Sequence, residues 1–241
     1  MSALGGDAHW AALKKFGDAH KDARAIVIVS AHWQTRGPTR ATSWEHAPLV
    51  YDFGGFPEEL YKITYPAPGD PSLAARIPGA VPEVNRGLDH GAWVPLRLAW
   101  PEAKIPVVEV SLPADDARAA FDLGRALRPL RDEHVIVIGS GGIVHNLGLV
   151  HLSEKNSGVD PWAADFDRWV AARLEARDVE GLFAYETSAP EAALAVPSPE
   201  HFNPLFVTLG ASWSEDRLET IYEGFHYGNL SMRSVALASS S

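Results

Sequence analysis

The sequence of 241 residues contains no cysteine, which excludes disulfide bonds, thiolate zinc sites, iron–sulfur clusters and a cysteine nucleophile. It also has no run near the roughly 20 apolar residues of a membrane span, and its first ten residues lack the charged start and apolar core of a signal peptide. We therefore expect a soluble, cytoplasmic protein. Any bound metal must be held by His, Asp or Glu.

Positive charge is scarce as well. The 21 Lys and Arg residues stand against 31 Asp and Glu residues, which gives a net charge of −10. A nucleic-acid binder needs a basic stripe and a polybasic membrane anchor needs a basic cluster. We therefore expect neither nucleic acid nor a membrane as a partner.

Three apolar, β-branched runs stand out in an otherwise ordinary globular composition, at residues 25–30, 106–112 and 135–139. Near-continuous Val/Ile runs are typical of strands that are buried on both faces, as in parallel sheets. Amphipathic helical patterns lie between and beyond these runs. The sequence predicts a single α/β domain over residues 1–241, with a mostly parallel or mixed central sheet flanked by helices.

Helix starts and one long irregular segment complete the outline. Asp7 is a predicted helix cap, and Asp160-Pro161 and Ser198-Pro199 have the cap-then-proline pattern of a helix start. The segment 34–93 is rich in proline, glycine and aromatic residues. It is too aromatic to be a flexible linker, so we interpret it as an ordered excursion that covers a site.

Ten histidines supply the candidate chemistry. His32 follows the first predicted strand, and His145 follows another strand behind the glycine-rich turn 139–142. If the strands are parallel, both side chains face the edge where α/β proteins bind ligands. A single strand-end histidine is more often a hydrogen-bonded loop residue, but two at equivalent strand ends favour a site. The turn matches neither a phosphate-binding loop nor a serine-hydrolase elbow.

Two further histidines have weaker signals. Asp89 directly precedes His90, and a carboxylate beside an imidazole can fix its tautomer and orientation. His201 lies in the predicted first turn of a helix, where a neutral imidazole, and hence a metal ligand, is favoured. Residue spacing alone thus supports a histidine-rich site at a sheet edge, with a metal as one possibility.

Seven motifs resemble the class III extradiol ring-cleavage dioxygenases, specifically the DOPA-dioxygenase type. They occur in the family's order and run nearly end to end along the chain. The motifs are SAHW (30–33), YDFGGFPEELY (51–61), YPAPGDP (65–71), GLDHGAWVPL (87–96), GSGGIVHNL (139–147), PSPEHFNPL (197–205) and YGNLSMRS (227–234).

The resemblance implies a metal-dependent enzyme that opens the ring of a small catechol beside its two hydroxyls, using O2. It implies Fe(II) as the cofactor, with Zn(II) as the alternative, because imidazole suits both metals. At the positions that match the family's motifs, the resemblance implies that His32 and His201 are metal ligands and that His145 is the catalytic acid/base. His90 becomes a second catalytic histidine that faces the substrate or supports the site.

Aromatic residues suggest the walls of the pocket. The chain has 8 Trp, 6 Tyr and 9 Phe, most of which we expect in the core. Tyr51, Phe53 and Trp93 are the candidates for substrate-binding residues.

One departure from the family leaves alternatives open. Family members begin with a strand that ends in an HGSPM-like turn, whose histidine is a further metal ligand. Residues 1–4 align best with the end of that turn, so the strand and its histidine are expected to be missing, through a mis-assigned start or through degeneration. A zinc-dependent hydrolase on the same site and a non-catalytic binding protein are therefore the alternative functions.

Overall fold

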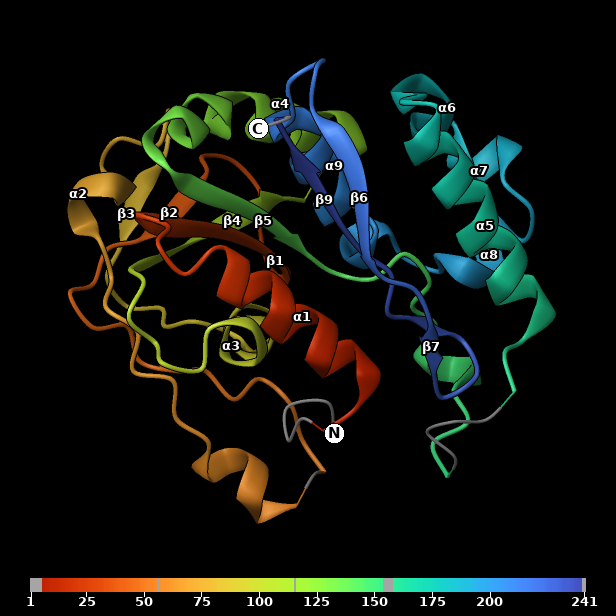
Figure 1. Ribbon diagram of the computed structural model, residues 1–241, viewed down its shortest axis with the longest axis horizontal. Coiled ribbons are helices and arrows are strands. Elements are labelled where there is room, and N and C mark those ends of the chain that lie inside the picture. Colours follow the sequence, from red (N-terminus) through yellow and green to blue (C-terminus); the bar gives the residue numbers. More distant parts are fainter. Residues whose placement is uncertain (1–5, 56, 115, 154–157, 240–241) are drawn as a thin grey trace.

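The β-branched runs form the centre of a five-stranded sheet in a computed structural model of the chain (Figure 1). The structure describes residues 6–55, 57–114, 116–153 and 158–239. Strand β1 (Ala25–Thr35) lies between β4 (Val107–Pro113) and β5 (Val135–Ser140) and is parallel to both. The short strands β2 (Arg40–Thr42) and β3 (Val81–Glu83) extend the sheet.

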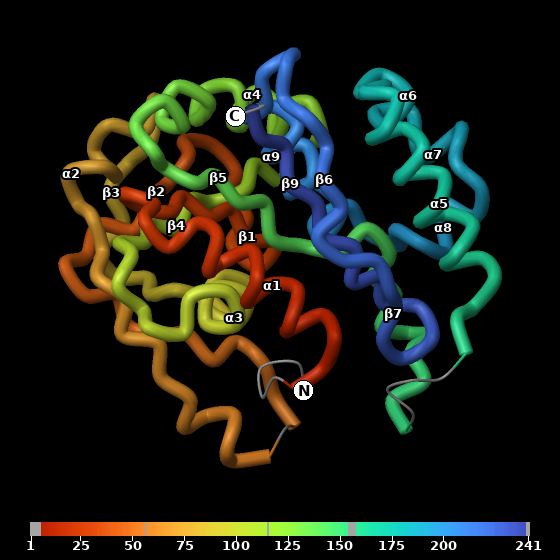
Figure 2. Tube along the Cα trace, viewed as in Figure 1, coloured from red at the N-terminus to blue at the C-terminus, as the bar shows by residue number. Residues whose placement is uncertain are grey.

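The sheet is mixed, as the sequence predicts. Its strand order is β3-β2-β4-β1-β5, with β2 antiparallel to β4 and parallel to β3. Helices cover both faces, so the chain has the expected α/β architecture: α1 (Ala8–Ala19) and α3 (His90–Ala99) lie below the sheet, and α4 (Ala117–Leu127) and α9 (Pro204–Ala211) lie above it (Figure 2).

Alternation along β1 explains why both faces are covered. Ile26 and Ile28 belong to one buried cluster, with Leu96 of α3, whereas Val27 and Val29 belong to the other. Successive side chains of a strand point to opposite faces, so a run of apolar residues needs an apolar partner on each side. The near-continuous Val/Ile pattern is thus satisfied by two cores, one on each face of the sheet.

The remaining elements include two antiparallel strand pairs, β6 with β9 and β7 with β8, and a set of mostly short helices. A long helix, α5 (Pro161–Glu175), and its short neighbours α6 to α8 form a separate layer at one side of the sheet (Figure 1). The other elements are η2 (Glu58–Lys62), α2 (Pro71–Ala74), η3 (Arg128–Glu133), η4 (Leu147–Leu149), α6 (Val179–Phe183), α7 (Tyr185–Ser188), α8 (Ala192–Ala195), η5 (Pro199–His201), β6 (Arg217–Tyr222), β7 (Phe225–His226), β8 (Leu230–Ser231) and β9 (Ser234–Ala238).

Two of the three predicted helix starts are confirmed. Asp7 caps α1 by accepting a hydrogen bond from the Trp10 amide at 2.8 Å, and α5 begins at Pro161 directly after Asp160. The third prediction is corrected. The segment from Pro199 forms only one 3-10 turn, and the α-helix, α9, does not begin until Pro204. Proline at 204 has no amide hydrogen for a helical bond, which separates the two pieces.

Strand β5 is an edge strand, and its outer side lines a large cavity. The cavity has a volume of about 1250 Å³ and is also lined by α1, α3 and β9. It extends along the sheet to the histidines described below. The expected missing turn falls on residues 1–4, which lie outside the described residues. Within the described part of the chain, no helix has the length and apolar character needed to cross a membrane.

Candidate active site

Four histidines from four separate segments meet at the carboxyl ends of β1 and β5. The ring centroid of His32, in β1, lies 4.0 Å from that of His90, at the start of α3, and 4.9 Å from that of His201, in η5. The His145 ring stacks on His201 at 3.6 Å with the planes 5° apart. The structure therefore brings together all four histidines that the sequence analysis singled out.

Glycines allow these segments to approach so closely. A Cβ atom on Gly91 would lie 2.3 Å from the Ser30 hydroxyl oxygen and 2.8 Å from the His32 ring. A Cβ on Gly141 would lie 2.1 Å from the carbonyl oxygen of His201, whose acceptor capacity is used by the Gly142 amide at 2.8 Å. The glycine-rich turn thus packs directly on the His201 backbone, which accounts for its composition without a phosphate ligand.

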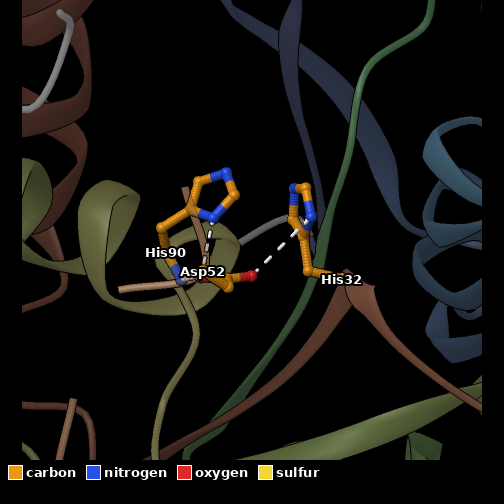
Figure 3. Close-up of side chains that lie close together, drawn as sticks. All are labelled: His32, Asp52 and His90. Carbon is orange, nitrogen blue, oxygen red and sulfur yellow. Dashed lines mark hydrogen bonds and ion pairs between the residues drawn. The ribbon is translucent and has the colours of Figure 1, made fainter. Parts of the chain in front are cut away.

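Asp52, which is not among the predicted site residues, joins two of these histidines (Figure 3). One of its carboxylate oxygens, Oδ1, lies 2.8 Å from Nδ1 of His90 and accepts a hydrogen bond from the His90 amide at 3.0 Å. The other, Oδ2, lies 3.9 Å from Nδ1 of His32. Asp52 lies in the proline- and aromatic-rich segment 34–93, 38 residues before His90. No spacing in the sequence reveals such a contact.

Asp89 does not play the role that its neighbouring position suggested. Its side chain is fully buried and caps α3 by accepting from the Ala92 amide at 3.1 Å. The same carboxylate accepts from the Ser30 hydroxyl at 2.7 Å and from the Arg86 guanidinium at 2.9 Å. Because the capping geometry turns the carboxylate away from the ring of the next residue, the partner of His90 is Asp52 instead.

His201 also has a carboxylate partner. Its Nδ1 lies 3.1 Å from the Glu200 carboxylate, whereas its Nε2 is buried without a hydrogen-bond partner among the described residues. A buried polar atom without a partner is costly in a folded protein. An imidazole held by a carboxylate on one nitrogen, with the other nitrogen open, is the usual arrangement of a metal-binding histidine.

Burial keeps these imidazoles neutral. Burial first, and the neighbouring His90 and His201 second, lower the pKa of His32 to about 4. Burial and then His201 lower the pKa of His145 to about 4, and burial also lowers the pKa of His201. Burial raises the pKa of Asp52, but the hydrogen bonds from His90 outweigh it and lower that pKa to about 2. The site therefore offers unprotonated imidazoles and a carboxylate at neutral pH, the forms that bind metals.

The donor set fits a metal ion. Ligand atoms of His32, Asp52 and His90 all lie within 4.8 Å of one another, and the open Nε2 of His201 belongs to a ring adjacent to His32. Imidazole and carboxylate donors suit iron and zinc. The group contains His32 but not His201, the other ligand that the resemblance implies. The residues of this site can therefore hold a divalent metal.

The predicted aromatic wall is only partly at the surface of the cavity. Phe53 lines it, with its ring 5.5 Å from His90 in an edge-on arrangement. Trp93 is fully buried and its indole N–H donates to the Val50 carbonyl at 3.2 Å. Tyr51 packs on Trp93 and donates its hydroxyl to the Ile63 carbonyl at 2.6 Å. Trp93 and Tyr51 thus support Phe53 from behind.

Known proteins share both the sequence and the fold of this chain. A protein of Beta vulgaris described as 4,5-DOPA dioxygenase extradiol is 42% identical over 91% of this chain and 84% of its own length. One of Escherichia coli (strain K12) with the same description is 38% identical over 98% of this chain and 90% of its own. The crystal structure of an uncharacterized protein from E. coli K12 has a TM-score of 0.82 and 35% identity, over 96% of this chain and 93% of that one.

The family model described as the catalytic LigB subunit of aromatic ring-opening dioxygenase matches residues 12–238. This range contains the whole sheet and all four histidines. The match agrees with the resemblance that the sequence motifs indicate, and with relatives that are extradiol dioxygenases by name. This chain therefore belongs to the LigB family of extradiol, aromatic ring-opening dioxygenases.

Proposed function

We propose that this protein opens the ring of a small catechol with O2, at a metal held by His32 and His201. One observation carries this proposal: four histidines and two carboxylates, from segments far apart in the chain, converge at the end of an apolar cavity. In a structural role such a cluster would be hydrogen-bonded throughout. Instead, the Nε2 atom of His201 is buried without a partner among the described residues.

The metal would be Fe(II), with Zn(II) as the alternative. When bound, Fe(II) passes electron density between a catecholate and O2, which zinc cannot do because it has no accessible redox couple. His32 and His201 supply neutral imidazole nitrogens for it, and Glu200 holds the His201 ring from the far side at 3.1 Å. Asp52 adds negative charge beside His32, which favours a divalent cation.

His145 is proposed to move the protons. Burial lowers the pKa of His145 to about 4, which leaves its imidazole unprotonated at neutral pH but makes it a weaker base than an exposed histidine. It can therefore accept a proton from a catechol hydroxyl whose own pKa is lowered in the site. Its ring lies directly on that of His201, so a substrate next to the metal is within its reach. The same group can return the proton to an oxygen of the opened ring.

The substrate class follows from the walls of the cavity and from the relatives. Phe53 offers an aromatic surface beside His90, suited to a flat ring. The relatives from Beta vulgaris and E. coli are 4,5-DOPA extradiol dioxygenases by name. We therefore propose a small catechol as the substrate and take L-DOPA as the first compound to test.

The test is oxygen uptake by protein loaded with Fe(II) under anaerobic conditions. On addition of L-DOPA and air, we expect one O2 consumed per catechol and a yellow, ring-opened product. Zinc-loaded protein should consume no O2. Hydrolytic activity with zinc and no O2 uptake with iron would support the hydrolase instead, and metal binding without any turnover would indicate a binding protein.

A further inference from the structure

His32 lies in a bulge of β1, at residues 31–33, where the strand leaves both of its neighbours. Pairing with β5 ends at Ser30. Pairing with β4 also breaks there and resumes at Gln34, so residues 31–33 lie outside both ladders. A bulge of this kind re-aims a side chain beside a site, but it leaves backbone N–H and C=O groups that need other partners.

Two side chains bind the backbone groups of His32 instead. Its N–H donates to the hydroxyl oxygen of Ser30 at 3.2 Å, and its carbonyl oxygen accepts from the Arg86 guanidinium at 3.2 Å. The guanidinium also lies over the ring of Trp33, the next residue, at 5.0 Å from the ring centroid. The backbone of His32 is therefore held on both sides.

Asp89 binds both of these side chains. Its Oδ1 accepts from the Ser30 hydroxyl at 2.7 Å, and its Oδ2 accepts at 2.9 Å from the same Arg86 nitrogen that donates to His32. The Asp89 side chain is inaccessible to solvent, so water does not compete for these charge-assisted bonds. Because Oδ1 also accepts from the Ala92 amide as the cap of α3, one carboxylate connects the bulge to that helix.

We propose that Asp89, Ser30 and Arg86 form a positioning unit that fixes the bulge of β1 and so points the His32 imidazole into the site. This inference rests on the proposed function for the metal that His32 would bind. A ligand that moves freely must be ordered on binding, which costs conformational entropy, and a backbone fixed beforehand removes that cost. Ser30 and Asp89 are fully buried, so the unit acts through His32 and not on the substrate.

Stabilisation of the fold alone is the competing role for these three residues. Removing one partner of a buried carboxylate is costly anywhere in a protein. The two roles differ in the properties of the folded variants. If the residues only stabilise the fold, variants unfold more easily but bind metal as wild type does. If they position His32, the folded variants also bind metal more weakly.

The experiment uses Ser30→Ala and Arg86→Met, each of which removes one hydrogen bond to the backbone of the bulge. Ser111→Ala is the matched control for the first, because that hydroxyl is also fully buried and accepts from a backbone N–H, that of Arg40, at 2.9 Å. Arg40→Met is the control for the second, because Arg40 pairs with Glu83 at 2.9 Å, the length of the Arg86 ion pair. Ser30→Ala removes only a hydroxyl and carries the test by itself if Arg86→Met does not fold.

The first measurement is zinc affinity by competition with a chelator, together with the visible absorption of cobalt-loaded protein, which reports the geometry of the site. We expect both variants to bind zinc about 10–100-fold more weakly and to alter the cobalt spectrum, as changes to groups that orient a metal ligand do. The controls should match wild type. A lower free energy of unfolding with unchanged zinc affinity and cobalt spectrum would overturn the proposal.

Amide hydrogen exchange of the metal-free protein separates this inference from the proposed function. We expect the His32 N–H to exchange about tenfold faster in both variants than in wild type, and faster than the N–H of Val27, which reports opening of the whole sheet. A His32 rate that is unchanged, or that only follows Val27, would overturn the proposal. Because exchange does not depend on the metal, a wild type that binds no zinc or opens no catechol would contradict the proposed function alone.

Discussion

The imidazole rings of His145 and His201 lie stacked, with centroids 3.6 Å apart and planes 5° apart. Two cationic rings could not stay in this arrangement, so at least one must be neutral. The Gly142 amide donates to the His201 carbonyl at 2.8 Å, and the His145 amide donates to the Ala195 carbonyl at 3.1 Å. The ring stack and the Gly142 hydrogen bond therefore connect the turn after β5 to the segment that carries His201.

Replacing His145 by alanine should separate metal binding from turnover. Because His145 is proposed to move protons and not to bind the metal, His145→Ala should retain bound iron and lose about a hundredfold or more in kcat. Metal analysis and O2 uptake of the same sample measure both. The exposed His20→Ala is the control. Loss of iron from His145→Ala would show that the ring is a ligand.

Adding a methyl group at Gly91 should disturb the site through packing alone. The new Cβ would lie 2.3 Å from the Ser30 hydroxyl oxygen and 2.8 Å from the His32 ring, so α3 or His32 must shift. We expect Gly91→Ala to lose about 1–3 kcal/mol of unfolding free energy and to bind metal more weakly. Gly54→Ala, where the Cβ meets nothing within 4 Å, is the control. Unchanged metal affinity in Gly91→Ala would contradict the close approach.

Glu109 gives the protein a predictable pH dependence of stability. It is fully buried, and burial first, then the charge of Asp89, raise the pKa of its carboxyl well above the usual range. The native state therefore keeps a proton that the unfolded state loses. The contribution to stability is complete below the unfolded-state pKa and falls by about 1.4 kcal/mol per pH unit as the pH rises from there toward the raised pKa.

Glu109→Gln should remove this dependence, because a glutamine amide stays neutral and can still accept from the Asp89 amide, as Glu109 does at 3.0 Å. We expect the variant to gain stability over wild type progressively as the pH rises above about 4.5. Urea unfolding at several pH values measures it. Parallel pH profiles for the two proteins would mean that Glu109 is ionised in the native state.

A buried ion pair anchors the C-terminal strands to α5. The Arg233 guanidinium donates to Asp167 at 2.7 Å, and both side chains are nearly inaccessible, at 4% and 2%. Arg233→Ala leaves the aspartate with the Ser231 hydroxyl, at 2.6 Å, but without its cationic partner, and should lower the free energy of unfolding by about 3–5 kcal/mol, measured by urea unfolding. Arg118→Ala removes an exposed side chain that pairs with Glu180 at the surface, and it should change the free energy of unfolding little. Similar losses for the two variants would contradict the account.

The three long strands of the sheet and the four histidines could be predicted from the sequence, because each depends on local patterns. Continuous Val/Ile runs define β1, β4 and β5. His32 lies within β1, just past its pairing with β5, and His145 follows β5 in the chain. Contacts across long separations could not be predicted. The hydrogen bond between Asp52 and His90 depends on how the segment 34–93 folds against α3. The sequence indicated Asp89 instead, but that carboxylate caps the start of α3.

The same limit applies to the cavity walls. Tyr51, Phe53 and Trp93 have the same aromatic character in the sequence, and only packing decides that Phe53 faces the cavity while Trp93 is buried. Proline 204 was a visible signal that the helix from Pro199 is interrupted, because it lacks an amide hydrogen.

The most direct test of the central claim, that His32 and His201 hold a metal beside His145, is the metal content after anaerobic Fe(II) loading and desalting. The account predicts close to one iron per chain in wild type, and little in His32→Ala and in His201→Ala. The His20→Ala control should match wild type. Near-zero iron in wild type, or full retention in both ligand variants, would contradict the claim.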